Sequence, residues 1–267
     1  MRVRVSHAGR ACVAVLLLAW AGSASAAEEI VKLPSQGDAV LPYLLSREPA
    51  REYKTVAVLF NGGDGKVGLL SRGIPMPGAN FLVRTRQLFV DRGVAAAVID
   101  IPSDVGGMPD GFRSSQRHVD DVATLLTDLS ARFPAARVFL VGTSRGTVSA
   151  AYAAAALSDR IAGVVLSSSV FNASRGGGPG LAGFDYRRIR APLLLVHHAE
   201  DTCHVTPYHA AKALEHSYPL VTVRGGKEAK SAPCDAFSPH GFFGKEAETV
   251  QAIADWMFGR PFATVIE

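Results

Sequence analysis

Short apolar runs alternate along this chain with longer amphipathic stretches. The apolar runs have the length of buried strands and lie at residues 56–60, 94–101, 138–141, 161–169, 193–197 and 220–223. Helical patterns fall at residues 81–92, 114–133, from 145 onward, and at 207–216 and 245–258. Residues 29–45 are expected to form a strand pair that turns at Ser35-Gln36-Gly37-Asp38. This alternation predicts an α/β fold, with a mostly parallel sheet and helices on both of its faces.

One of these strands leads directly into a Gly-x-Ser-x-Gly motif. Residues 138–141 are followed by Gly142-Thr143-Ser144-Arg145-Gly146, and an Ala-rich segment that favours a helix comes next. The glycines let the backbone reverse sharply and pack closely. The N–H groups that begin the helix then point at whatever the serine attacks. The pattern predicts Ser144 as a nucleophile; the alternative is a tight turn with an N-capping serine.

A nucleophilic serine needs a base, and the base needs an acid that orients it. Asp201 follows the strand at 193–197, and His240 lies in a late loop. The chain resembles the α/β-hydrolases, in which Ser, Asp and His follow one another in this order. The resemblance extends from residue 56 to residue 256 and is closest to small, capless, exported members. It implies Ser144 as nucleophile, Asp201 as acid and His240 as base.

Other carboxylates and imidazoles compete for these roles. Glu200 stands beside Asp201, and Asp235 lies five positions before His240, so both are alternatives for the acid. Asp201 is favoured because the family's acid lies a residue or two past this strand. Of the other histidines, His197 and His198 at a strand end are interpreted as structural, His204 and His209 follow Asp201 too closely, and His118 falls in a predicted surface helix.

The oxyanion of the reaction needs two backbone N–H donors. The resemblance implies Arg145, the residue after the nucleophile, as one of them. The second is expected in the loop Asn61-Gly62-Gly63-Asp64-Gly65, where many family members carry His-Gly. By position the donor is Gly63, with Asp64 as the neighbouring alternative. A phosphate-binding loop is disfavoured, since the segment lacks both the Lys-Ser/Thr ending and the glycine spacing of a dinucleotide site.

The first 26 residues have the pattern of a Sec-type signal peptide. Three arginines precede an apolar segment at 11–21, and Ala24-Ser25-Ala26 forms a cleavage site. The segment is too short to span a bilayer permanently. Cleavage would remove three positive charges and lower the formal charge from +4 to +1, so composition indicates neither nucleic acid nor an anionic membrane as a partner. We expect a periplasmic or secreted protein with a single domain at residues 27–267.

Two cysteines, Cys203 and Cys234, remain after this cleavage. Export places them where disulfides form, and each flanks a different residue of the expected triad. We predict that they are bonded and that the bond ties the loop of Asp201 to the loop of His240. The paired spacing of a zinc site is absent, and the expected chemistry needs no cofactor.

The sequence predicts a serine hydrolase that acts on a small-molecule carboxylic ester. Amide, peptide or thioester hydrolysis uses the same groups, and a non-catalytic binding protein is the alternative from another class. Residues 171–190, where larger relatives insert a lid, are too few for a lid domain, so the site should be open or covered by loops. Candidates for the substrate pocket are Met108, Phe112, Phe171, Phe184 and Phe242, with Lys66, Arg113 and Arg145 for a carboxylate.

Overall fold

The computed structural model describes residues 27–75, 80–174 and 177–267. The predicted signal peptide, residues 1–26, lies outside the described residues, so its cleavage and the export of the protein stay predictions. Within the described part of the chain, no helix is both long and apolar enough to cross a membrane.

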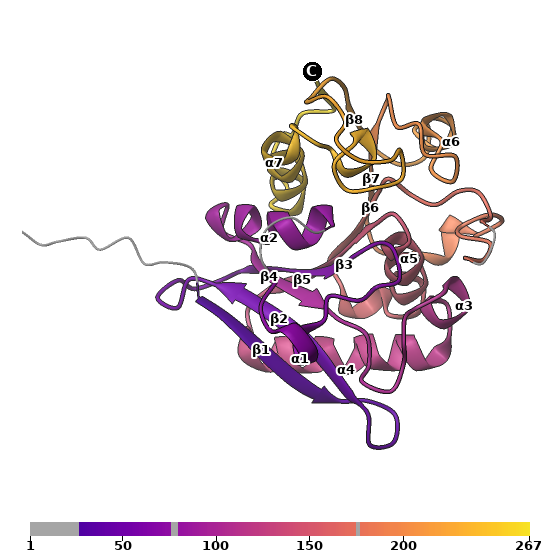
Figure 1. Ribbon diagram of the computed structural model, residues 1–267. Helices are drawn as coiled ribbons and strands as arrows, with labels where there is room; N and C mark the ends of the chain where they lie inside the picture. Colours follow the sequence, from indigo (N-terminus) through magenta and orange to yellow (C-terminus); the bar gives the residue numbers. More distant parts are fainter. Residues whose placement is uncertain (1–26, 76–79, 175–176) are drawn as a thin grey trace, which may run out of the picture.

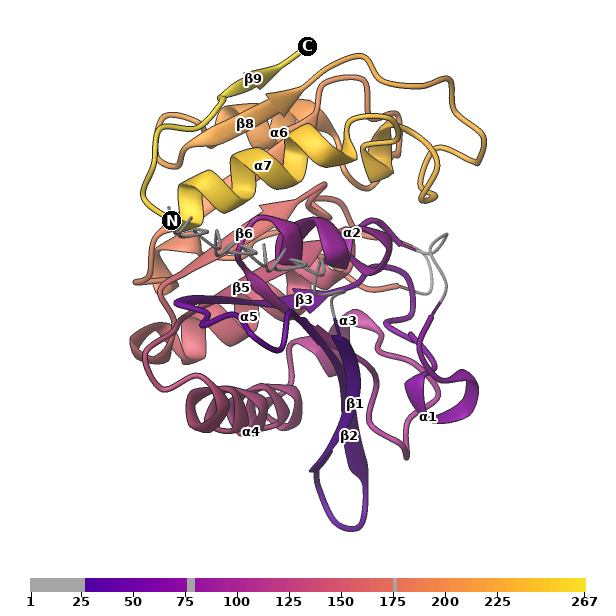
Figure 2. The same cartoon turned by 90° about the vertical axis from the view of Figure 1, so that its left-hand side faces the viewer.

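Nine strands of the described residues form one sheet in the order β1-β2-β4-β3-β5-β6-β7-β8-β9 (Figure 1 labels β1 to β8, and Figure 2 labels β9). They are β1 (Ala27–Pro34), β2 (Val40–Arg47), β3 (Thr55–Phe60), β4 (Ala95–Ile99), β5 (Arg137–Thr143), β6 (Gly163–Ser167), β7 (Leu193–His198), β8 (Leu220–Val223) and β9 (Val265–Ile266). β2 pairs antiparallel with both β1 and β4, and each neighbouring pair from β4 to β9 is parallel. The mostly parallel sheet is therefore confirmed.

Helices cover both faces of the sheet, as Figures 1 and 2 show. They are α1 (Leu69–Arg72), α2 (Phe81–Asp91), α3 (Asp110–Arg113), α4 (Gln116–Arg132), α5 (Gly146–Ala156), α6 (Tyr208–Ala213) and α7 (Glu246–Met257). One hydrophobic core joins the sheet to α4, α5 and α6, and a second core joins the opposite face to α1, α2 and α7. α3 lies against α4 and α5.

The central strands are apolar on both faces because both are covered. In β3, Val56 and Val58 belong to the core beneath α4 and α5, whereas Ala57 and Leu59 belong to the core beneath α2 and α7. Successive side chains of a strand point to opposite faces, which explains the unbroken apolar run of this segment. The parallel strands end on one edge, and this edge carries the loops described below.

Every strand and helix expected from the sequence is present, with ends that differ by a few residues. The strands of the N-terminal pair span Ala27–Pro34 and Val40–Arg47, slightly beyond the expected segment. The short elements α1, α3 and β9 were not predicted. The described part of the segment 171–190 is loop and a short 3-10 helix, Tyr186–Arg188, and it forms no separate lid.

Candidate active site

Ser144 occupies a sharp turn between β5 and α5. Its φ angle of 52° is in the left-handed region, which a non-glycine residue adopts only when its surroundings impose it. A Cβ atom on Gly146 would lie 2.0 Å from the carbonyl oxygen of Phe60, and one on Gly142 would lie 2.5 Å from that of Gly146. Only glycine fits at these two positions. The turn is thus fixed by close backbone packing and holds Ser144 at the carboxyl edge of the sheet.

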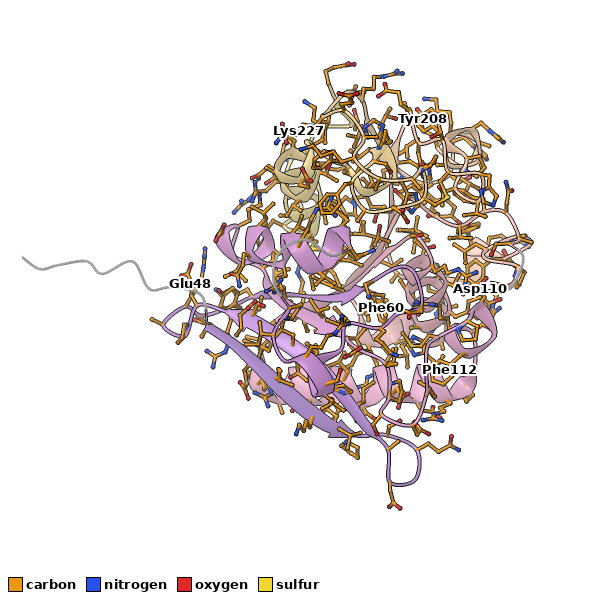
Figure 3. All side chains as sticks on the ribbon, in the orientation of Figure 1. Glu48, Phe60, Asp110, Phe112, Tyr208 and Lys227 are labelled. Carbon is orange, nitrogen blue, oxygen red and sulfur yellow. A yellow bond between two sulfur atoms is a disulfide. The ribbon has the colours of Figure 1, made fainter. Side chains whose placement is uncertain are left out.

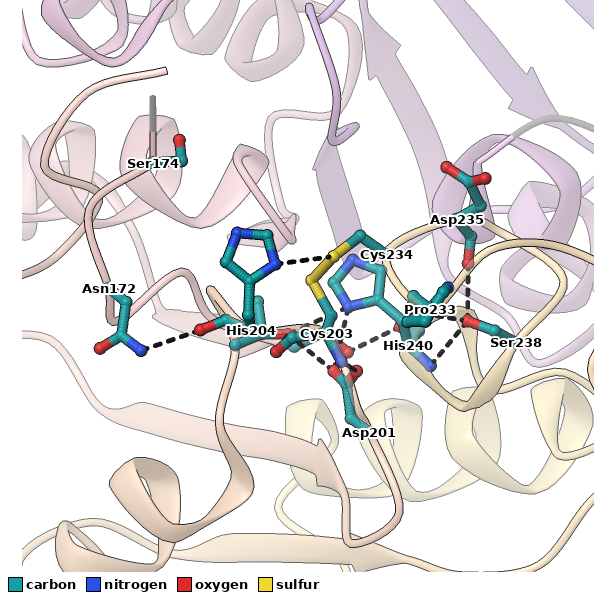
Figure 4. Close-up of a disulfide and its surroundings, with 12 residues drawn as sticks. Asn172, Ser174, Asp201, Cys203, His204, Pro233, Cys234, Asp235, Ser238 and His240 are labelled. Carbon is teal, nitrogen blue, oxygen red and sulfur yellow. Dashed lines mark hydrogen bonds and ion pairs between the residues drawn. A yellow bond between two sulfur atoms is a disulfide. The ribbon is translucent and has the colours of Figure 1, made fainter. Parts of the chain in front are cut away.

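Asp201 and His240 contact each other beside this edge. Asp201 follows β7, and its Oδ2 lies 3.0 Å from Nδ1 of His240 (Figure 4). Oδ1 of Asp201 accepts the N–H of Cys203 at 2.9 Å, and Oδ2 also accepts the Thr206 hydroxyl at 2.8 Å. Burial alone would raise the pKa of Asp201, but the hydrogen bond and charge of His240 and these two donors bring the pKa below its ordinary value of 3.8. Asp201 is held as a carboxylate.

The same strand end, that of β6, contacts both Ser144 and His240. The N–H of Ser144 donates to the carbonyl of Ser167 at 3.0 Å, and the hydroxyl of the next residue, Ser168, donates to the carbonyl of His240 at 2.8 Å. Nδ1 of His240 is engaged by Asp201. Its Nε2, the atom that would take the serine proton, is buried and has no hydrogen-bond partner among the described residues. Among the described residues, His240 therefore forms no hydrogen bond with the Ser144 hydroxyl.

The loop that carries His240 is fixed on both sides of the imidazole. The Ser238 hydroxyl accepts the N–H of His240 at 3.2 Å and donates to the carbonyl of Asp235 at 2.9 Å. Arg84 of α2 donates to the carbonyl of Gly241 at 2.7 Å. The next side chain, Phe242, is fully buried in the core beneath α2 and α7. These contacts set the position of the ring before any substrate binds.

Neither alternative acid contacts His240. The carboxylate of Glu200 accepts the N–H of Gly225 at 3.0 Å and lies 3.7 Å from Nδ1 of His198. Asp235 is exposed. Its backbone carbonyl, rather than its carboxylate, accepts the hydrogen bond from the Ser238 hydroxyl. The structure brings Asp201 to His240 and leaves Glu200 and Asp235 apart from it.

The two histidines at the end of β7 are buried in neutral form. His197 Nε2 donates to the carbonyl of Thr206 at 2.8 Å, and burial lowers the pKa of His197 to about 4. His198 donates to the carbonyl of Gly225 at 3.0 Å, and burial lowers its pKa as well. Both support the loops around Asp201, which agrees with the structural interpretation.

His118 does not lie on the surface, contrary to the expectation from the sequence. It lies on α4, but its side chain is buried between Phe60 and Phe112. Burial, and secondly the charge of Arg113, lower the pKa of His118 to about 3. The expected surface helix is present as α4, and His118 lies on its buried face.

The expected oxyanion loop lies against the nucleophile. A Cβ atom on Gly62 would lie 2.9 Å from Cβ of Ser144. The N–H of Gly65 donates to the carbonyl of Gly62 at 3.1 Å and closes a tight turn in which Gly63 has a φ angle of 60°. Within the described residues, the N–H groups of Gly63 and Arg145 make no hydrogen bond. Both donors are available to an oxyanion, as is the N–H of the alternative, Asp64.

A cavity of about 540 Å³ opens beside this loop, and we call it the side cavity. Its walls come from residues 61–64 and 66–67, from residues 72–75 with Asn80 and Val83, and from residues 234–236 of the His240 loop. Val67, Ile74 and Val83 give it apolar surface. The cavity is lined by two basic residues, Lys66 and Arg72, and by two acidic residues, Asp64 and Asp235. A small molecule with apolar and polar parts fits this mixed lining.

Most of the residues suggested for substrate binding do not line the side cavity. Of the three basic candidates only Lys66 does so, because Arg145 donates to the Ser174 hydroxyl at 2.7 Å and Arg113 is fully buried. The aromatic and methionine candidates anchor loops instead. Phe171 stacks on His197, Phe184 packs on Tyr152, Phe112 on His118 and Phe242 on Phe81, and Met108 is buried.

Two site residues were not found from the sequence. The Thr206 hydroxyl lies 2.8 Å from Oδ2 of Asp201 and 3.2 Å from Nδ1 of His240, which places it between the two. The Asp100 carboxylate accepts the N–H groups of Val67, Gly68 and Leu69 and holds one wall of the side cavity. No sequence motif marks either residue, because the contacts of each form only when the loops have folded.

Cys203 and Cys234 form the predicted disulfide (Figure 4). Cys203 is buried beneath the Asp201 loop, and Cys234 is exposed on the His240 loop, with its Sγ 3.9 Å from Nδ1 of His204. The bond links two loops that are 31 residues apart in sequence. Because the two sulfur atoms are bonded to each other, they are not thiolate ligands for a metal.

Solved structures share this architecture over most of the chain. Est1E from Butyrivibrio proteoclasticus aligns with a TM-score of 0.60 and 14% identity, covering 86% of this chain and 98% of its own. The α/β-hydrolase fold is established by this agreement. A cold-adapted esterase from an Arctic intertidal metagenomic library gives 0.57 and 18%, with 88% and 94% covered. A lidless α/β serine hydrolase from Xanthomonas campestris gives 0.54 and 15%, with 84% and 94% covered.

Comparison of the sequence with protein families gives one match. The family described as serine aminopeptidase, S33, matches residues 103–184, the segment that contains Ser144. This match supports a serine hydrolase. No curated protein matches the chain.

Proposed function

We propose that this protein is an exported serine hydrolase that cleaves small carboxylic esters with Ser144, His240 and Asp201. The observation that carries the proposal is the oriented imidazole. His240 lies 3.0 Å from a buried carboxylate, keeps Nε2 free, and is bonded to the strand end that also holds Ser144. This is the Asp–His half of a catalytic triad, and the contact of Nε2 with Ser144, which this structure does not contain, is part of the proposal.

The reaction follows from the positions of these groups. Ser144 Oγ attacks the ester carbonyl while Nε2 of His240 takes the hydroxyl proton. Asp201 keeps the Nδ1–H tautomer and stabilises the imidazolium. The N–H groups of Gly63 and Arg145 stabilise the negative oxygen of the tetrahedral intermediate. The imidazolium returns its proton to the leaving alcohol, and a water activated by His240 then releases the acid from the acyl-enzyme.

An ester of modest size suits the side cavity, which adjoins Ser144 through the oxyanion loop but is not lined by Ser144 itself. The side cavity borders the oxyanion loop, offers both apolar and polar surface, and has a volume of about 540 Å³. Segment 171–190 forms no separate lid in its described part, so the site is open to small molecules. Two of the structural neighbours named above are described as an esterase and as a serine hydrolase without a lid. The disulfide supports export, since such bonds persist in oxidising compartments.

Peptide cleavage is the second candidate, and the serine aminopeptidase description of the matching family favours it. The same acyl-enzyme chemistry cleaves ester bonds and peptide bonds, but an amine is a poorer leaving group than an alcohol. The lining of the side cavity fits either substrate.

A substrate panel decides between these functions. Purified protein without residues 1–26 would be assayed on p-nitrophenyl esters of graded acyl length, on aminoacyl p-nitroanilides and on thioesters, each beside Ser144→Ala. The proposal expects turnover of one or more esters that is lost in Ser144→Ala. Faster turnover of the anilides would favour the peptidase. Ester turnover equal to that of Ser144→Ala would contradict the proposal.

A further inference from the structure

Arg113, at the end of α3, has a fully buried side chain. Removing a guanidinium from water is costly unless its charge is paired. Within the described residues Arg113 forms no ion pair, and Asp110 and Asp64 act on it only through space. Burial lowers the pKa of Arg113 only to about 10, so the group is charged at neutral pH. A hydrophobic core does not require a buried cation, so the position of Arg113 calls for another explanation.

Among the described residues, all hydrogen-bond acceptors of Arg113 are neutral, and they belong to three different segments. Nε donates to the carbonyl of Met108 at 2.9 Å, and Nη1 donates to the hydroxyl of Ser149 at 2.9 Å. Nη2 donates to the carbonyls of Asn61 at 3.4 Å and Gly63 at 3.3 Å. Ser149 lies on α5, the helix that starts at the nucleophile, and Asn61 and Gly63 belong to the oxyanion loop. The guanidinium therefore bridges these two parts of the site.

The two carbonyls of the loop flank the peptide that carries the expected donor. The N–H of Gly63 belongs to the peptide between Gly62 and Gly63. The Asn61 carbonyl belongs to the preceding peptide and the Gly63 carbonyl to the following one. Arg113 binds both of them, while the N–H of Gly65 binds the carbonyl of Gly62 in the middle peptide. Three successive peptide planes are thus each held by a hydrogen bond.

Such a clamp has a clear use, because glycines leave the backbone of this loop many alternative conformations. Gly63 is exposed and has a positive φ angle, and glycine restricts its own backbone less than any other residue. An oxyanion donor is effective only when it is held in place before the charge develops. Figure 3 labels Phe60 at the end of β3 and Asp110 and Phe112 in α3, the two segments that this bridge joins.

We propose that Arg113 is a positioning residue that holds the Gly63 N–H in place relative to Ser144. The inference rests on the proposed function, in which Gly63 stabilises the oxyanion. Arg113 touches no reacting atom; it acts through the loop and through α5. Its loss should weaken stabilisation of the transition state and leave binding of the intact ester unchanged.

The test compares Arg113→Met and Arg113→Lys with the wild type and with the matched control Arg187→Met, whose side chain is 87% exposed. Arg113→Met removes the charge at similar volume and should lower kcat about 10-fold to 100-fold, somewhat less than the loss of an oxyanion donor itself. KM should stay within about threefold. Arg113→Lys keeps the charge but cannot bridge both carbonyls, so its kcat should be intermediate. Arg187→Met should match the wild type.

A second readout separates positioning from a role in the core. Phenylboronic acid forms a tetrahedral adduct on a serine nucleophile, and its affinity should fall with kcat/KM across the series. Thermal melts of both Arg113 variants should stay cooperative: Arg113→Met replaces a buried charge without an ion pair by an apolar group of similar volume, and Arg113→Lys keeps the charge and can still donate to one of the carbonyls. Wild-type kcat and boronate affinity in a folded Arg113 variant would overturn the proposal. So would failure of both variants to fold, which would assign Arg113 to the core. An inactive wild type would instead defeat the proposed function.

Discussion

Nδ1 of His240 lies 3.0 Å from Oδ2 of Asp201, although the two residues are 39 positions apart and belong to different loops. Three features bring them together: the end of β7 places the carboxylate, Ser168 holds the His240 backbone, and a disulfide joins the two loops. The proposed chemistry depends on this pair, because a histidine acts as the base for a serine only in the correct tautomer.

Asp201→Asn should therefore lower kcat by a factor on the order of 10⁴, since an amide at this position favours the wrong imidazole tautomer. Glu200→Gln is the matched control, because Glu200 bonds to Gly225 and not to His240. Steady-state kinetics of both variants on the best ester check the assignment. A larger loss in Glu200→Gln than in Asp201→Asn would show that the wrong carboxylate has been chosen.

Thr206→Val should lower kcat about tenfold. The change keeps the shape of the side chain but removes the hydroxyl that donates to Oδ2 of Asp201 at 2.8 Å. A hydrogen bond to a charged group contributes roughly 1.5–3 kcal/mol, and losing it frees the carboxylate to move. Thr206→Ser keeps the hydroxyl and should retain most of the rate. Equal kcat values for the Val and Ser variants would leave Thr206 without a role in the triad.

Loss of the disulfide should affect both rate and stability. Cys203→Ser/Cys234→Ser opens a loop of 31 residues, and closing a loop of this size contributes roughly 3–4 kcal/mol in the chain-entropy model. We also expect kcat to fall, because displacement of a catalytic group by about 1 Å can cost a hundredfold in rate. Thermal melts and kinetics of the double variant measure the two effects. A lower Tm with unchanged kcat would make the bond a purely structural one.

Stability should fall as the pH is lowered from about 6.5, because His118 is buried in neutral form. Its pKa is about 3 in the folded protein against an ordinary value of 6.5, so below 6.5 the unfolded chain binds more protons than the folded one. At about pH 5 this difference amounts to about 2 kcal/mol for one histidine. Between about pH 7 and about pH 5, the Tm of His118→Phe should therefore fall less than the Tm of the wild type.

His209→Gln is the control for this series, since His209 is exposed. It should keep the wild-type pH dependence of Tm. Some dependence should also remain in His118→Phe, because burial holds the pKa of His197 at about 4. An unchanged pH dependence in His118→Phe would show that His118 does not take up a proton on unfolding.

The strands and long helices could be predicted because their apolar patterns depend on local sequence and on burial in a covered sheet. The four-residue helices α1 and α3 could not. α1 begins where the Asp100 carboxylate accepts the N–H groups of Gly68 and Leu69, a contact between distant segments. β9 has two residues and exists only by pairing with β8.

The candidate triad could be named from the sequence because the motif at Ser144 and the order Ser, Asp, His resemble the α/β-hydrolases; Ser144 and Asp201 follow predicted strands, and His240 lies in a loop before the last predicted helix. The contacts that support it were beyond the sequence. Thr206 reaches Asp201 only when its turn closes, and Arg113 reaches the Gly63 loop only when α3 packs on α5. A charged residue on a short polar segment carries no signal that it will be buried.

The central claim, that Ser144 is the nucleophile, is tested most directly by covalent labelling. The protein would be treated with a fluorophosphonate and the adduct located by peptide mass spectrometry, with Ser144→Ala and the exposed control Ser217→Ala in parallel. We predict one adduct, on Ser144, in the wild type and in Ser217→Ala, and no adduct in Ser144→Ala. Labelling that persists in Ser144→Ala, or a wild-type protein that takes up no label, would contradict the account.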